Sequence, residues 1–405
     1  FRSNVLRRAN RLIEAVENNK ITDAEKNQAN VNNIYAQAKS VRALVHFDLV
    51  KVYGMPYSFD NGASMGVPIV TTPIDPLNAS AIPGRNTVAE VYTQIVKDLT
   101  EAIDSKALNV SKSAGDNQGF IDEWAAKALL TRVYIYMGKN QEALDMAKNI
   151  IENSPYSLWT KAQYANAWDK NNANHINEMI FELVNSGSDD WADREGIAYL
   201  YHEDGYADAI CTKSFVDMLA QDPSDVRLDV ILPVQLKTDD NGKPTDMYKT
   251  YGDNRIFINK FPMGSLGDMR LNNLPILRLS EVYLNAAEAA AKLNDKTSTA
   301  KYLNEIIKNR TDDTKQLVTE STATLERVLL ERRKELVGEG QRFFDAMRNN
   351  ETVTRYTNED EKGWHYSINK ESQVFDRTYF RTILPIPVSE TNANPTLKAQ
   401  QNPGY

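Results

Sequence analysis

The sequence has very little cysteine and no long apolar run, and both shortages exclude classes of protein. Its single cysteine, Cys211, rules out an internal disulfide framework and a thiolate metal cluster, so we expect a packed thiol there. Even the alanine-rich run at residues 286–291 is interrupted by charge, whereas a transmembrane helix needs roughly 18 consecutive apolar residues. The chain is therefore expected not to span a bilayer.

Histidines are also few, and their spacing does not favour a metal centre. The four lie far apart, with no pair at the spacing of helical metal ligands: His46, His175, His202 and His365. The oxygen-rich segment DDNGKPTD at residues 239–246 lacks the spacing and the final glutamate of an EF-hand loop, which leaves calcium there as a minor alternative. We expect neither a metal nor a cofactor, and we expect His46 to be a packed residue of a helix.

Positive charge is in deficit. Lysine and arginine number 47 against 55 aspartate and glutamate residues, the net charge is -8, and no basic block is long enough to follow a phosphate backbone. Nucleic acid is therefore not an expected partner. The hydrophobic fraction of 41% and the charged fraction of 25% are ordinary for a globular protein and argue against extended disorder.

Helical periodicity is what the sequence contains in abundance. Small and aliphatic residues recur at three- and four-residue spacing from residue 36 onward, at Ala38, Val41, Val45, Leu49 and Val52. This helix is expected to end at Gly54. A second helix is predicted at residues 88–103, with Thr87 as its N-cap and Glu90 as the capping-box partner.

Residues 123–155 have the spacing of a tetratricopeptide helix-turn-helix unit. The positions that carry this spacing are Leu130, Tyr134, Gly138, Ala143 and Pro155. Similar helical pairs are predicted at residues 275–310 and 325–347. Such units cannot bury their apolar faces singly, so several must stack. We therefore predict a mostly α fold, a tetratricopeptide-like superhelix of helical pairs, with long irregular loop insertions and a few short strands.

The 405 residues are expected to form one domain in which a helical scaffold alternates with loop-rich excursions. The scaffold is predicted at about residues 1–52, 87–155 and 275–348. The excursions are predicted at about residues 53–86, 156–274 and 349–405, with a strand-like run at 179–184. Long irregular segments inside a compact domain are usually functional loops, so function is expected in the excursions.

Four separated stretches resemble the SusD/RagB family. The most specific is ERRKELVGEGQRFFDAMR at residues 331–348, which is similar to the C-terminal signature of the family. The others are LPILRLSEVYLNAAEAAAKLN at 274–294, RALVHFDLVKVYGMPY at 42–57 and LPIPVSETNANPTLKAQQNPGY at 384–405. They also follow the order of the family, so the resemblance covers nearly the whole chain.

The resemblance implies a lipid-anchored protein at the cell surface, in the outer membrane of Bacteroidota. Such proteins bind nutrient without catalysis and act as a lid on a SusC-like TonB-dependent transporter, which imports glycan or, more rarely, peptide. The family begins with a lipoprotein signal and an acylated cysteine, whereas this sequence opens directly on an amphipathic pattern and looks trimmed at its front. Cys211 is internal and cannot be that anchor.

The charged residues of the C-terminal signature at 331–348 are expected to form a structural network of ion pairs. On a helix, Asp345 lies three residues from both Arg342 and Arg348, on one face, where opposite charges pair. A glycosidase would instead need two carboxyl groups flanking the sugar, one of them with a raised pKa. The candidates for that alternative are Asp189, Asp190, Asp193, Glu203 and Asp204, whose simpler interpretation is solvated loop charge. No GxSxG motif is present, and we expect no enzyme.

The expected binding residues are loop aromatics beside amides and charged groups, because sugars stack on rings through their C–H faces and hydrogen-bond through their hydroxyls. The first excursion supplies Tyr57, Phe59, Asp60 and Asn61, and the middle excursion supplies Asn185, Trp191, Arg194, Tyr199, Tyr201 and Tyr206. Trp124, Trp159 and Trp168 are predicted to be core, and Trp364 and Tyr366 are less favoured. Peptide capture in a groove and a docking role for the helices both stay open.

Overall fold

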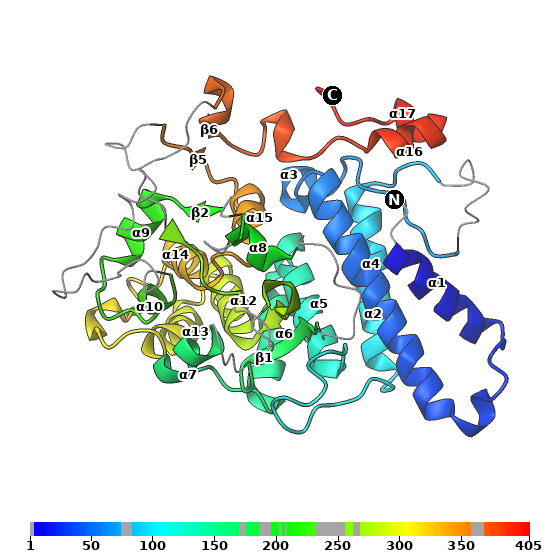
Figure 1. Ribbon diagram of the computed structural model, residues 1–405, viewed down its shortest axis with the longest axis horizontal. Coiled ribbons are helices and arrows are strands. Elements are labelled where there is room, and N and C mark those ends of the chain that lie inside the picture. The colour runs from blue at the N-terminus through cyan, green and yellow to red at the C-terminus, as the bar shows by residue number, and fades with distance from the viewer. Residues whose placement is uncertain are drawn as a thin grey trace.

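The computed structural model describes residues 4–73, 83–169, 175–185, 196–201, 205–206, 209–231, 256–261, 268–357 and 368–405. Over these ranges the chain is mostly helical, and its short strands pair two by two. The predicted fold class is therefore confirmed. Figure 1 shows the N-terminal helices on one side, most of the middle excursion on the other, and the C-terminal segment along one edge.

Three long helices form the N-terminal part of the scaffold. α1 (Asn4–Glu17) packs on α2 (Gln28–Tyr53), and α2 packs on α4 (Val88–Asp104). The side chains between α2 and α4 are fully buried, among them Phe47, Val50, Ile95 and Leu99. Helix α2 begins ahead of its predicted start, because the polar turn before residue 36 continues the same helix.

The facing ends of α2 and α4 follow local rules. Gly54 follows the last residue of α2 in an extended conformation, and glycine suits this position because a Cβ atom there would lie 2.9 Å from the Val50 carbonyl oxygen and 3.0 Å from Val88. At the start of α4, Thr87 Oγ1 accepts a hydrogen bond from the Glu90 amide at 3.2 Å, and Glu90 Oε2 accepts one from the Thr87 amide at 2.8 Å. The predicted capping box is confirmed.

Thr87→Ala is expected to lower the free energy of unfolding by about 1 kcal/mol, because the Glu90 amide at the start of α4 loses its acceptor. Urea denaturation measures this change. Thr93→Ala is the matched control, because Thr93 is exposed on the same helix and its replacement is expected to change stability by less than about 0.5 kcal/mol. Equal losses in the two variants would contradict the role of the cap.

Each of the three predicted helical units contains two helices. They are α5 (Glu123–Met137) with α6 (Asn140–Asn153), α12 (Leu279–Lys292) with α13 (Lys296–Lys308), and α14 (Leu325–Glu335) with α15 (Arg342–Arg348). Gly138 joins α5 to α6 with a positive φ of 71°, the left-handed conformation that glycine favours at a helix end. Helix α12 packs against α5, α6, α13 and α14, and therefore lies at the centre of the stack.

One part of a predicted helical unit is a strand instead. Residues 275–278, expected to open the second unit, belong to β4 (Leu274–Arg278), and the helix starts at Leu279. β4 pairs antiparallel with β1 (Met179–Leu183), the strand predicted in the middle excursion. The extended form prevails because its backbone groups find hydrogen-bond partners in β1, and both strands pack against α5.

The excursions carry short elements. Those of the first and middle excursions are α3 (Tyr57–Asp60), α7 (Lys161–Ala167), α8 (Ile197–Tyr201), β2 (Ile210–Cys211), α9 (Lys213–Leu219), α10 (Arg227–Ile231), β3 (Ile256–Phe257) and η3 (Met269–Leu271). Those of the C-terminal segment are β5 (Val353–Thr354), η5 (Lys370–Ser372), β6 (Val374–Phe375), η6 (Phe380–Thr382), α16 (Val388–Ala393) and α17 (Pro395–Ala399). Two further 3-10 turns are η1 (Ala24–Lys26) and η4 (Thr314–Gln316). β2 pairs with β3 and β5 with β6, both antiparallel.

The apolar core is divided among several clusters. The largest lies between α2, α4, α5, α6, α12 and α13. A second cluster, formed by residues of the middle excursion, contains Trp159 and Trp168, and a third contains Cys211. The core positions predicted for these two tryptophans and for Trp124 are confirmed, and His46 and Cys211 are packed as expected. Burial raises the pKa of the Cys211 thiol to about 12, so it stays protonated at neutral pH.

Charged side chains of the C-terminal signature are buried in ion-pair networks. Glu335, the last residue of α14, has no exposed surface and lies among three arginines. Its carboxylate accepts hydrogen bonds from Arg310 Nε at 2.9 Å, Arg278 Nη1 at 3.1 Å and Arg227 Nη1 at 3.3 Å. Glu178, just before β1, pairs with the same Arg310 at 3.1 Å. The network thus joins the middle excursion to the helical scaffold.

A second network surrounds Asp345. Its carboxylate pairs with Arg348 at 2.7 Å, as predicted, and with Arg332 at 3.2 Å. The predicted pair with Arg342 is wrong, because Arg342 Nη2 lies 2.7 Å from Glu351 Oε2. The Arg342 side chain is 38% exposed, whereas Asp345 is buried among the other arginines. Spacing along the helix predicts which ion pairs are possible. The residues that pack against α15 determine which of these pairs form.

Candidate functional site

Two of the predicted site residues, Tyr199 and Tyr206, form a ring pair. Their centroids are 5.7 Å apart, their planes meet at 46°, and Tyr206 is 54% exposed. The Tyr206 amide donates to the Tyr199 carbonyl oxygen at 2.7 Å. Gly205 permits this turn, since a Cβ atom there would overlap the same oxygen. The local backbone therefore holds the two rings side by side.

Charged groups lie near this pair. Helix α8, which carries Tyr199, packs against η3. At η3, Arg270 Nη2 donates to Asp268 Oδ2 at 2.5 Å, and the hydrogen bonds from the Arg270 side chain and amide lower the pKa of Asp268 to about 2. The pKa of Arg270 is raised, first by its hydrogen bond to Asp268 and, more weakly, by the nearby Tyr199. The ion pair is thus formed at neutral pH.

Asn185 is anchored to the residues that follow η3. Its Nδ2 donates to the Asn272 carbonyl oxygen at 2.7 Å, and its amide donates to Asn273 Oδ1 at 3.0 Å. Asn185 is exposed and lies shortly after β1. The residues that these contacts gather are called the tyrosine-pair surface below: Tyr199, Tyr206, Asp268, Arg270 and Asn185.

Tyr201 lies differently from its two neighbours in sequence. Its ring stacks on Phe261, with centroids 5.5 Å apart and planes at 18°, and it packs against the cluster that contains Cys211. Burial raises the pKa of its hydroxyl. One face of the ring is therefore covered, and Tyr201 holds α8 on the core.

The predicted residues of the first excursion lie on or beside α3. Tyr57 is half-buried and packs edge-on against Tyr92, with centroids 5.3 Å apart and planes at 71°. Asp60 accepts a hydrogen bond from Ser64 Oγ. Asn61 ends α3 in the left-handed conformation, with a φ of 57°, and is exposed. Tyr57 and Asp60 thus shape this loop, while Asn61 lies at its surface.

Phe59 is 40% exposed, and an arginine covers one side of its ring. The guanidinium of Arg377 lies 5.5 Å from the ring centroid, and Arg377 Nη1 donates to Ser58 Oγ at 3.1 Å. These contacts join the first excursion to the C-terminal segment. Among the described residues, the predicted site residues of the first excursion therefore contact the C-terminal segment, and they are not part of the tyrosine-pair surface.

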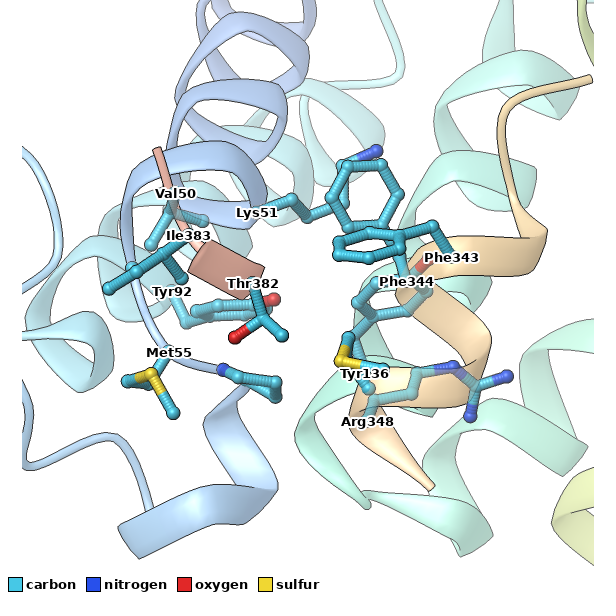
Figure 2. A pocket seen from close by; sticks show the side chains of 13 residues that line it. Val50, Lys51, Met55, Tyr92, Tyr136, Phe343, Phe344, Arg348, Thr382 and Ile383 are labelled. Carbon is cyan, nitrogen blue, oxygen red and sulfur yellow. The ribbon is translucent and has the colours of Figure 1, made fainter. Parts of the chain in front are cut away.

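Beside α3 lies a small enclosed pocket, shown in Figure 2. Its volume is about 20 Å³, which admits one water molecule and no sugar ring. Lys51 Nζ lies 4.6 Å from the Phe47 ring centroid and 4.9 Å from that of Phe344, and burial lowers its pKa. Met55 and Thr382 line the side of the pocket opposite Phe344 in Figure 2. This pocket belongs to the packing between α2 and α15.

Comparison with known proteins decides the family. Residues 233–405 match the family model described as the SusD family, and residues 4–135 match one described as starch-binding associating with outer membrane. A SusD superfamily protein from Bacteroides thetaiotaomicron is 38% identical, with a TM-score of 0.83, over 98% of this chain and 83% of that chain. The chain belongs to the SusD family. The family resemblance carried by the C-terminal signature is thereby confirmed.

Other SusD-family relatives are similar over the same length. A protein from Bacteroides vulgatus, named for sugar binding, is 36% identical with a TM-score of 0.83, over 99% of this chain and 83% of that chain. A SusD-like protein from Formosa agariphila is 23% identical over 99% of this chain and 78% of its own length. The likeness therefore extends across the scaffold and the excursions alike.

Several predicted residues of this SusD-family chain lie outside the described ranges. They are Trp191, Arg194, Asp189, Asp190, Asp193, Glu203, Asp204, His202, His365, Trp364, Tyr366 and the segment 239–246. Within the described ranges, no three His, Cys, Asp or Glu side chains gather as a group that could hold a metal ion. In the same part of the chain, none of the helices has the length and apolarity that a membrane crossing requires.

Sequence reasoning missed the charged half of the tyrosine-pair surface. The local signal is an aspartate two residues before an arginine, at positions 268 and 270, which suits a capped turn with a side-chain pair. Such pairs are common in loops and do not identify a site. The packing of η3 against α8, far earlier in the chain, is a tertiary contact that no local pattern reveals.

Proposed function

We propose that this SusD-family chain is a non-catalytic subunit that binds glycan at the cell surface and delivers it to a SusC-like TonB-dependent transporter of the outer membrane. The observation that carries the proposal is the tyrosine-pair surface, where two neighbouring rings lie near an ion pair and an exposed amide. The name of the Bacteroides vulgatus relative, which refers to sugar binding, and the family description that refers to starch support the same ligand class.

Each group on this surface suits one part of a sugar. The exposed ring of Tyr206 offers a face for the C–H groups of a pyranose, and Tyr199 extends that face. Sugar hydroxyls can donate to Asp268 and accept from Arg270 and Asn185. Because the Asp268–Arg270 bond already holds both side chains, binding immobilises few additional rotamers.

The carboxyl group on this surface is unsuited to hydrolysis. With a pKa of about 2, Asp268 is ionised at neutral pH, whereas the general acid of a glycosidase needs a raised pKa to hold its proton. We therefore propose binding without turnover. Prolonged incubation with maltoheptaose should release no new reducing ends, and their appearance would contradict this assignment.

We further propose that a lipid on a cysteine ahead of this sequence attaches the protein to the outer membrane. Cys211 does not suit that role, because it is buried and its thiol pKa is about 12. The family description that refers to association with the outer membrane supports the proposed membrane location. Co-purification of the native, full-length protein with a TonB-dependent transporter is the expected result.

Tyr206→Ala is expected to weaken binding of a neutral oligosaccharide roughly tenfold, because a stacked ring contributes on the order of 1 kcal/mol beyond the area it covers. Isothermal calorimetry with maltoheptaose and with laminarihexaose measures the loss. The helical circular dichroism signal should stay unchanged, because Tyr206 is 54% exposed. Trp191→Ala, suggested by the sequence, is expected to act in the same direction.

Tyr35→Ala is the matched control, because Tyr35 is a partly exposed ring on α2 whose hydroxyl donates to Glu17 of α1 at 2.8 Å, among the N-terminal helices. Its replacement should leave the affinity unchanged. If Tyr206→Ala binds both oligosaccharides as tightly as the unmodified protein, the tyrosine pair is not the site. If the unmodified protein binds no oligosaccharide but retains peptides from a protein digest, the peptide-binding alternative replaces this proposal.

A further inference from the structure

A groove of about 400 Å³ opens beside the β5–β6 pair. Figure 1 shows this strand pair at the upper left of the molecule. The walls of the groove come from β6 and from the segments that flank this pair, and they consist of Thr352, Glu371, Val374, Asp376, Thr378 and Tyr379. No residue of the tyrosine-pair surface lines this groove. The volume lies within the range of small-ligand sites, which is roughly 300–1,000 Å³.

Aromatic rings form the floor of this groove and continue beyond it. Phe375 is buried beneath the groove, and its ring centroid lies 5.8 Å from that of Tyr379. Tyr379 contacts Phe380 at 5.3 Å, and Phe380 contacts Tyr405 at 5.3 Å. The last two rings are 36% and 48% exposed. A row of four rings therefore leads from the groove along the C-terminal segment.

The rings are held in place before any ligand arrives. The Tyr405 hydroxyl donates to the Ile383 carbonyl oxygen at 2.9 Å, which anchors the outer end of the row. The inner end rests on a small cluster that contains Phe375 and Met347 of α15. A ligand that lies along the row would therefore meet a surface that needs little reorganisation.

The polar groups of the groove are hydrogen-bond acceptors and hydroxyls. Asp376 Oδ1 accepts from the Thr378 amide at 2.8 Å and from its hydroxyl at 2.6 Å, which orders the turn after β6. Glu371 is exposed and adds a second carboxylate. Hydroxyl groups of a ligand can donate to both carboxylates. Sulfate or carboxylate groups would be repelled by them.

The nearby arginines are occupied by rings. The guanidinium of Arg355 lies 4.9 Å from the Phe375 ring centroid, and that of Arg377 lies over Phe59 of the first excursion. Neither arginine is among the described residues that line the groove, and these include two acids and no base. The described lining of the groove therefore combines an aromatic floor with acceptors for hydroxyl groups and includes no cation. Arg381 lies farther along the ring row, 5.2 Å from the Phe380 ring centroid.

We propose that this groove is a second carbohydrate site, which binds a neutral oligosaccharide that extends over the ring row toward Tyr405. The inference rests on the proposed function, because a second glycan contact has a purpose only in a glycan-binding protein. Two separated contacts on one chain suit a long polymer, which each contact alone would hold weakly.

Val374→Arg tests the groove without disturbing the core. The Val374 side chain is 56% exposed on β6 and lines the groove, so a long charged side chain there should fill it. Val388→Arg on α16 is the matched control, because Val388 is 72% exposed and lies outside the groove. Each substitution is made in the unmodified protein and in the Tyr206→Ala variant, where the groove is the remaining proposed contact.

Isothermal calorimetry with maltoheptaose, laminarihexaose and trigalacturonic acid gives the readout. In the Tyr206→Ala variant we expect residual binding of the neutral probes, a further loss of about tenfold or more with Val374→Arg, and no change with Val388→Arg. Binding of trigalacturonic acid as tightly as the neutral probes, or no residual binding in Tyr206→Ala, would overturn the inference.

Failure of the inference can be told apart from failure of the proposed function. If Tyr206→Ala weakens binding and Val374→Arg has no effect, the groove is excluded and the proposed function stands. If neither neutral probe binds the unmodified protein, both are overturned.

A spin label provides a second measurement that does not depend on losing affinity. A nitroxide at Lys370→Cys, beside the groove, should broaden the proton signals of bound maltoheptaose, and a nitroxide at Ile34→Cys, on α2, where Ile34 is 44% exposed, should not. Cys211 stays unlabelled because it is buried and its thiol pKa is about 12. Equal broadening from both positions, or none from either, would place the sugar elsewhere and overturn the inference.

Discussion

Glu335→Gln is expected to lower the free energy of unfolding by about 3–5 kcal/mol, because it removes the charge of one partner from a buried ion network. Glu335 has no exposed surface and accepts hydrogen bonds from Arg310, Arg278 and Arg227. Glutamine keeps the shape of the side chain but leaves three buried guanidinium groups with less negative charge to balance them. The loss is therefore electrostatic and creates no cavity.

Urea denaturation of the two proteins measures this loss. Glu305→Gln is the matched control, since Glu305 makes an exposed ion pair with Lys308 at 3.1 Å, with side chains 42% and 55% exposed. Exposed pairs of this kind contribute about 0–1 kcal/mol. A change below about 1 kcal/mol in Glu335→Gln would show that the network does not stabilise the fold.

The same substitution should also loosen the middle excursion. Arg278 ends β4, and its Nη1 donates to both Glu335 and Glu178, the residue just before β1. Amide hydrogens of the β1–β4 pair are therefore expected to exchange faster in Glu335→Gln than in the control. Because Asn185 follows β1, a weaker network is expected to disturb the tyrosine-pair surface as well.

Acidification from pH 6.5 to pH 4 is expected to lower stability by about 3 kcal/mol through His46 alone, at about 1.4 kcal/mol per pKa unit. His46 is buried, and burial lowers its pKa from 6.5 to about 4. Its Nδ1 lies 3.0 Å from the Arg42 carbonyl oxygen, and its Nε2 lies 3.2 Å from the Val70 amide nitrogen. The neutral ring satisfies both partners, donating to the first and accepting from the second.

The sign of this effect follows from the lowered pKa. The unfolded chain binds a proton on this histidine below pH 6.5, whereas the folded chain binds it only below about pH 4. Stability is therefore complete above pH 6.5 and is lost as the pH falls toward 4. Protonation would also turn Nε2 into a donor that faces the Val70 amide.

His46→Gln is expected to remove most of this pH dependence, because glutamine keeps an acceptor for the Val70 amide and does not titrate. Thermal or urea unfolding at intervals between pH 7 and pH 4 measures the difference between the two proteins. A separate loss should remain at lower pH, because the arginines around Glu331 hold its folded pKa at about 2, below the usual 4.5. Parallel stability curves for the two proteins above pH 4 would contradict the role of His46.

Much of the fold could be predicted from the sequence because helix ends obey local rules. The Thr87–Glu90 capping box marks the start of α4 and depends on neighbours within a few residues. Gly54 marks the end of α2, where the close approach of Val88 adds a tertiary constraint. The division of the chain into one domain with a scaffold and three excursions stays a prediction. The exception was β4, whose backbone partners lie in a distant strand.

The candidate site was less predictable, because exposure of a ring depends on what packs against it. Tyr199, Tyr201 and Tyr206 looked equivalent in the sequence. In the folded chain Tyr201 stacks on Phe261, whereas the other two form a pair near Asp268 and Arg270. In the C-terminal segment the sequence offered Trp364 and Tyr366 as less favoured candidates. The row from Phe375 to Tyr405 was not predicted, because tertiary contacts bring its rings together.

Family and helical class could be predicted from the order of the amino acids, since both are carried by local sequence patterns. Which charged side chains pair with one another was decided only by the tertiary structure. Arg342 pairs with Glu351 and not with Asp345, and η3 brings a charged pair beside Tyr199. Such contacts join residues far apart in sequence, and their energies depend on burial, which arises only when the helical pairs and excursions pack together.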